Sequence, residues 1–138
     1  MGLYLCIFDE EDEEVDGVEV GLYSDFNALR DYVARELEGG SRGARFPILM
    51  LHSDSDGEWS VADCEKLIPE LRNIIAEMQA RPTVEFASDW QKHVARSVGL
   101  APRSAFEAFI DVDGQFVLER MLHLASVALE RGLPILFQ

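Results

Sequence analysis

The residues whose types and spacing come closest to a chemical site lie in the polar segment HSDSDGEWSVAD, residues 52–63. With Gly57 at the sixth position of a calcium-binding loop, oxygen ligands would come from Asp54, Asp56, Ser60 and Asp63. The match is poor, because Asp63 stands where a longer glutamate is usual and His52 stands where an oxygen ligand is needed. We therefore predict no metal and no cofactor, and expect a turn in which the aspartates bond nearby backbone amides.

The same segment also offers an acid–base pair. His52 lies close to Asp54 in the chain, and a neighbouring carboxylate favours a charged imidazole. No serine in a G-x-S-x-G turn accompanies them, and His93 and His123 have no second histidine or cysteine at metal-ligand spacing. We predict no catalytic residue, and we keep a small metal-binding or hydrolytic enzyme using His52, Asp54 and Asp56 as an alternative.

Acidic residues dominate the charge of the chain. Aspartate and glutamate number 26 against 12 lysines and arginines, which gives a net charge of −14. Such a surface repels nucleic acid and anionic membranes and attracts a basic protein partner. One run near the start of the chain concentrates this charge: Asp9, Glu10, Glu11, Asp12, Glu13, Glu14 and Asp16. The alternative interpretation is a solvated loop between two strands.

A large aromatic ring in a polar segment has two interpretations. Trp59 either covers the edge of the core or anchors a partner, since tryptophan is enriched at interfaces. We therefore predict two candidate surfaces for partner binding. One is the acidic run, and the other is a loop surface made of Asp54, Asp56, Glu58 and Trp59.

Hydrophobic patterning predicts the elements that position these residues. Strands at 3–8 and 18–23 form an N-terminal hairpin whose connection carries the acidic run. Further strands are expected at 46–51, 104–112 and 134–138, and helices at 26–37, 61–78, 89–98 and 117–129. Ser24 or Asp25 is expected to cap the first helix, and Ser60 with Asp63 the second, which Pro69 should kink or divide.

These elements predict an α/β fold, with α+β as the alternative. We expect a single domain over residues 1–138, in which a mixed sheet with an N-terminal hairpin is covered by about four helices. A strand at either end of the chain could form a sheet edge and pair with a second copy, so a homodimer stays open.

The location of the protein follows from what the chain contains and lacks. No signal-peptide pattern and no apolar run of membrane-spanning length is present in the sequence. Cys6 and Cys64 stand among apolar neighbours, which indicates buried reduced thiols. We therefore expect a cytoplasmic protein.

Three stretches together carry a resemblance to a known family: MGLYLCIFDEEDEEVDGVEVGLYSDFNALRD, RFPILMLHSDSDGEW and FIDVDGQFVLERMLHLASVALERGLPILFQ. They resemble the immunity protein 70 family of bacterial polymorphic toxin systems, over essentially the whole chain. The resemblance implies a cytoplasmic antidote that binds and neutralises a cognate toxin domain made by the same cell or its kin. It supplies no catalytic residues. An adaptor module of an unrelated assembly is the remaining alternative.

Overall fold

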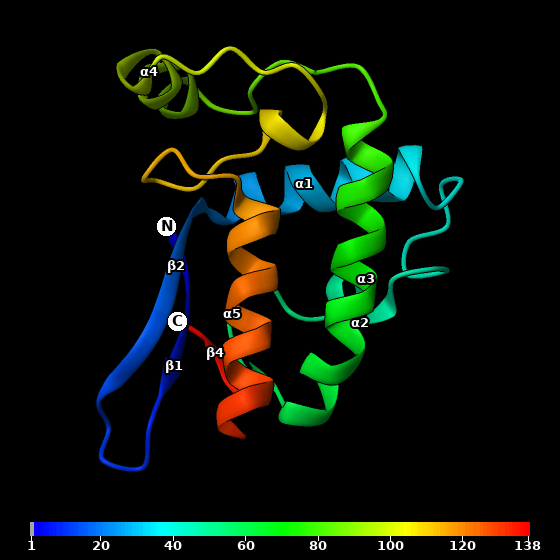
Figure 1. The fold of residues 1–138 in the computed structure, drawn as a ribbon. Coiled ribbons are helices and arrows are strands. Elements are labelled where there is room, and N and C mark those ends of the chain that lie inside the picture. Colours follow the sequence, from blue (N-terminus) through cyan, green and yellow to red (C-terminus); the bar gives the residue numbers. More distant parts are fainter. Residues whose placement is uncertain (1) are drawn as a thin grey trace.

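A four-stranded sheet forms one layer of the structure, a computed structural model that describes residues 2–138. Its strands, in spatial order, are β2 (Glu14–Leu22), β1 (Gly2–Phe8), β4 (Ile135–Phe137) and β3 (Glu58–Trp59). The predicted N-terminal hairpin is confirmed, because β1 and β2 pair from Gly2 opposite Leu22 to Phe8 opposite Glu14. Figure 1 shows the tip of this hairpin, which carries the acidic connection, lying beyond the packed helices.

Both terminal strands lie inside the sheet. β4 pairs with β1 on one side and with β3 on the other, so the two edges are β2 and β3. The prediction that a terminal strand offers an edge for dimerisation is therefore wrong. All strand pairs are antiparallel, so the sheet is not mixed as predicted. Two further strands that were expected in the sheet, at 46–51 and 104–112, do not form.

Three long helices pack against the sheet: α1 (Tyr23–Glu36), α3 (Val61–Gln79) and α5 (Val117–Arg131). α3 and α5 contact each other along their length, and α1 crosses behind them in Figure 1. Apolar residues spaced three and four apart face a common core with alternate residues of β1 and β2. This core includes Leu3, Leu5, Ile7, Val18, Phe26, Leu29, Val33, Leu67, Leu71, Ile74, Leu118 and Met121.

The helix ends agree with the sequence in most places. Ser60 and Asp63 cap α3 reciprocally, as predicted. α3 continues through Pro69 as one helix, so it is not divided into two. The predicted cap of α1 is wrong: Leu22 is the N-cap, and Asp25 lies in the first turn, where its carboxylate accepts the Leu22 N–H at 2.9 Å.

The apolar run at residues 46–51 forms a short helix, α2 (Pro47–Met50), and not the predicted strand. Charged side chains bond its backbone ends. The Glu70 carboxylate accepts the N–H groups of Ile48 and Leu49, both at 3.1 Å, and Arg30 donates to the carbonyls of Leu49 and Met50. An apolar run of this length has no periodicity that separates a buried strand from a buried helix, so the side-chain partners decide its conformation.

Residues 104–112 also form no strand. They contain the short 3₁₀ helix η1 (Phe106–Ala108), and a single bridge joins Ile110 to Phe116. Ahead of them lies α4 (Asp89–Val98), as predicted, which ends at the left-handed Gly99. Apolar residues are buried on both sides of Glu107, at 105–106 and 108–110, a pattern that a strand buried on both faces would also give.

The predicted α/β class is confirmed, because the structure has one sheet with helices packed against it. Within residues 2–138 the structure holds five α-helices, of which α2 is a single turn. None of these helices combines the length and the apolar composition that crossing a membrane requires.

Candidate interaction site

The acidic run is divided between the hairpin tip and the second strand. Glu14 and Asp16 belong to β2, while the tip exposes four carboxylates, those of Glu10, Glu11, Asp12 and Glu13. Asp9 orders the tip from within, because its carboxylate accepts the N–H groups of Glu11 and Glu13, both at 2.9 Å. The tip therefore presents its charge on a defined turn.

The two acids on β2 are bonded to the rest of the protein. The Tyr4 phenol donates to the Glu14 carboxylate, and this bond, followed by burial, raises the pKa of Tyr4 to about 12. The Asp16 carboxylate accepts the Gly17 N–H at 2.8 Å and lies 3.6 Å from the His123 ring on α5. The charge that remains free for a partner is thus mainly at the tip.

The segment 52–63 does not gather its oxygen atoms into a metal site. The Asn27 amide on α1 donates to the Asp54 carboxylate at 2.7 Å, and this bond is the main cause of a lowered pKa of Asp54. Ser60 and Asp63 are occupied in capping α3. Across residues 2–138, no three His, Cys, Asp or Glu side chains are grouped so that they could hold a metal ion. The contacts support the interpretation as a turn.

Trp59 belongs to the core. Its side chain is 1% exposed, and its indole N–H donates to the Ile48 carbonyl at 3.1 Å. The first of the two interpretations of this residue therefore holds, and its ring is not available on the surface for a partner. Glu58 beside it is exposed, as is Asp56, so these two acids stay as surface candidates of the loop.

His52 is held by backbone groups. Its ring stacks on Phe137 with centroids 4.1 Å apart, and its two nitrogens lie 2.8 and 2.9 Å from the carbonyl oxygens of Ser53 and Glu58. The ring nitrogens thus face carbonyls and not Asp54, so the acid–base pair considered from the sequence is not formed.

The two cysteines are free and buried, as predicted. Burial is the main cause that raises the pKa of Cys6 and of Cys64 to about 11 in each case. The thiolate, which is the reactive form, is therefore scarce at neutral pH, and neither thiol has the environment of a nucleophile.

A buried carboxylate fixes the turn after η1. Asp111 is 1% exposed and accepts the N–H groups of Asp113 and Gln115 at 2.9 and 3.0 Å. Burial raises the pKa of Asp111, although the Arg120 Nε lies 3.6 Å from its second oxygen. Arg120 also donates to the Gly17 carbonyl on β2 at 3.0 Å, so this turn is attached to the outer edge of the sheet.

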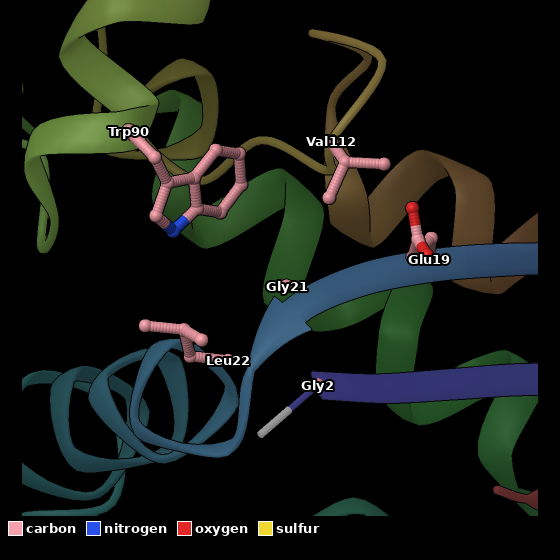
Figure 2. Close-up of a pocket in the computed structure, with 6 residues that line it drawn as sticks. All are labelled: Gly2, Glu19, Gly21, Leu22, Trp90 and Val112. Atoms are coloured by element: carbon pink, nitrogen blue, oxygen red, sulfur yellow. The ribbon is translucent and has the colours of Figure 1, made fainter.

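A hollow of about 400 Å³ lies beside this turn, where β2 passes into α1 and α4 approaches from above (Figure 2). Its walls are the Trp90 ring of α4, Leu22 at the start of α1, and Val112. Gly2 and Gly21 form its floor, and Glu19 is the charged side chain among the lining residues that the structure describes. We call these six residues the β2–α4 pocket.

Asp25 holds two walls of the β2–α4 pocket in place. Its carboxylate, 4% exposed, accepts the Trp90 indole N–H at 2.8 Å and the Leu22 N–H at 2.9 Å, and the Ser88 hydroxyl donates to its other oxygen. Trp90 is packed so closely over Gly21 that a β-carbon at Gly21 would lie 2.6 Å from the ring. Only glycine fits there, since its φ of +120° also disfavours other residues.

The β2–α4 pocket was not predicted from the sequence. The Trp90 ring is half-buried and borders the pocket. The sequence does contain one signal: a buried indole N–H usually has a hydrogen-bond acceptor, and Asp25 in the first turn of α1 is one. The pairing of two residues so far apart in the chain could not be read from spacing.

The distinctive groups of this fold thus lie on its surface: an acidic hairpin tip and an apolar pocket. The chain matches the family model described as Immunity protein 70 over residues 3–137. It therefore belongs to the immunity protein 70 family. Comparison with curated proteins and with solved structures gave no match.

Proposed function

We propose that this protein is a cytoplasmic antidote of a polymorphic toxin system, which neutralises a cognate toxin domain by binding it and not by catalysis. The observation that carries the proposal is the family match over residues 3–137, which names an immunity protein. The toxin domain would come from the same cell or its kin, and the antidote would protect the cell that makes it.

The acidic hairpin tip supports a basic surface on the toxin as the partner. A net charge of −14 with exposed carboxylates at Glu10, Glu11 and Glu13 attracts a cationic protein at long range and speeds the encounter. The projecting position of the tip in Figure 1 lets it reach into a concave surface such as an active-site cleft.

Co-expression tests this function. The toxin domain encoded beside this gene should arrest growth when expressed alone, and growth should recover when this protein is expressed with it. A purified pair should form a complex with a measurable dissociation constant. Arrest that continues in the presence of well-folded, abundant protein would contradict the proposal.

Charge reversal tests the role of the hairpin tip. Glu10→Lys, Glu11→Lys and Glu13→Lys in one variant should slow association with the toxin by about tenfold or more and weaken its salt dependence. The matched control reverses three exposed carboxylates elsewhere, those of Glu65, Glu85 and Glu130. Equal association rates for the two variants would show that only net charge matters, and not the tip.

A further inference from the structure

We propose that the β2–α4 pocket receives an arginine side chain of the toxin domain, an inference that rests on the proposed function. The lining of the pocket has two parts, and each matches one part of an arginine side chain. The apolar walls of Leu22, Val112 and the Trp90 ring suit the aliphatic stem, and the Glu19 carboxylate at the rim suits the cationic head. The Trp90 ring adds the preferred aromatic face for a cation.

The pocket exposes apolar surface that has no role in the core. Leu22 is 41% exposed, although leucine at this position could be replaced by a polar N-cap residue with a gain in helix stability. Exposed apolar groups beside a charged rim are typical of protein interfaces, where arginine is one of the residues that contribute most to binding.

The walls are fixed before any partner arrives. Asp25 bonds the Trp90 indole and the Leu22 N–H, and the Val112 N–H donates to the Glu19 carbonyl at 3.1 Å. A preformed pocket loses little conformational entropy on binding, so its contacts contribute fully to affinity.

The lining favours a protein side chain over a small metabolite. The pocket volume of about 400 Å³ would suit either ligand. A small-molecule site, however, usually has several polar groups that point at its ligand. Here one carboxylate is the charged group among apolar walls and glycine backbone.

One toxin domain can contact both the pocket and the hairpin tip. They lie at opposite ends of β2, and the ten residues from Glu13 to Leu22 span ~30 Å in extended conformation. An interface of standard size, with about 800 Å² on each partner, is wide enough to cover that distance. Glu19 at the pocket rim belongs to the same edge strand as Glu14 and Asp16, so acidic side chains follow this strand from the tip to the pocket.

Fluorine NMR of the full chain tests occupation of the pocket directly. The protein has two tryptophans, so 5-fluorotryptophan labelling gives one signal from Trp90 and one from Trp59, assigned with Trp90→Phe. Adding the unlabelled toxin domain should shift the Trp90 signal, while the signal of Trp59, 1% exposed in the core, stays in place. An unmoved Trp90 signal in a saturated complex would overturn the inference.

Two variants test the chemistry of the occupant by calorimetry. Leu22→Ser should weaken toxin binding by about tenfold or more, and Glu19→Gln by several-fold with a flatter salt dependence. The matched control is Leu51→Ser, since Leu51 is 65% exposed and borders a different hollow near Trp59. It should bind as the wild type does. Unfolding curves of all three variants confirm that each is folded.

The outcomes separate this inference from the proposed function. Wild-type protein that does not bind the neighbouring toxin domain contradicts the proposed function. Wild-type binding that is unchanged in both Leu22→Ser and Glu19→Gln contradicts the pocket alone. If Leu22→Ser weakens binding and Glu19→Gln leaves it unchanged, the inference of an arginine is also overturned, because the occupant would then be an apolar side chain.

Discussion

Several charged side chains of this protein are bonded to backbone groups and not chiefly to opposite charges. Glu38, 6% exposed, accepts the N–H groups of Gly43, Arg45 and Phe46, each at 3.0 Å. Arg30, 4% exposed, donates to the carbonyl of His52 at 2.7 Å and to those of Leu49 and Met50. Irregular segments can be buried here because charged side chains satisfy their backbone polar groups.

Replacing Arg30 should therefore destabilise the protein much more than replacing an exposed arginine on the same helix. Arg30→Met removes the donor to the carbonyls of Leu49 and His52, whereas the Met50 carbonyl keeps Arg42, and we expect a loss of about 2–4 kcal/mol in the free energy of unfolding. Arg35→Met, whose native side chain is 63% exposed, should cost less than ~0.5 kcal/mol. Urea denaturation of both variants measures the difference, and equal losses would contradict the role of Arg30.

At the scale of elements, α4 is joined to the main body through its first turn. Trp90 and Ser88 both bond Asp25 on α1, and Ala95 supplies a further buried contact in the second half of the helix. Figure 1 shows α4 lying apart from the packed α1, α3 and α5. The stability of α4 should thus depend strongly on a few contacts and be lower than that of the core helices.

Trp90→Phe tests this dependence by removing the indole donor while keeping an aromatic ring. The amides near the end of α4 should exchange with solvent about tenfold faster or more, because a hydrogen bond to a charged group is worth about 1.5–3 kcal/mol. Amides of Leu71 and Ile74 in α3 provide the control within the same sample and should exchange as before. Uniform acceleration across both helices would show that α4 does not open separately.

The sequence predicts the regular elements well and the irregular ones poorly, for a physical reason. The hairpin, α1, α3, α4 and α5 follow from local periodicity and capping residues such as Ser60 and Asp63. The residues 46–51 and 104–112 take their conformations from distant partners, which local patterns do not contain. The same reason applies to the site: the exposed acidic tip is visible in composition, whereas the β2–α4 pocket depends on Asp25 meeting Trp90 across the chain.

At the scale of the whole molecule, uncompensated negative charge is the leading electrostatic feature. Seven ion pairs join a lysine or arginine to a carboxylate within the described residues, but 26 acidic residues against 12 basic ones leave a large excess. Repulsion among the excess charges opposes the compact state and is reduced by dissolved salt.

Sodium chloride should therefore stabilise this protein. Raising ionic strength from about 0.01 M to about 0.15 M shortens the screening length from ~30 Å to ~8 Å, and the melting temperature should rise by a few degrees. A variant with Glu10→Gln, Glu11→Gln and Glu13→Gln carries less repulsion at the hairpin tip and should show a smaller rise. A melting temperature that falls with salt would mean that attractive ion pairs outweigh the repulsion.

The pairing of the first strand with the last has a consequence for how the protein is made. Leu5 and Cys6 of β1 lie opposite Phe137 and Leu136 of β4, so the middle of the sheet joins residues from the two ends of the chain. A ribosome must release Ile135–Phe137 from its exit tunnel before that pairing can form. The hairpin of β1 and β2 can therefore form early in synthesis, whereas the pairing of β1 with β4 has to wait until all the residues between them have been made.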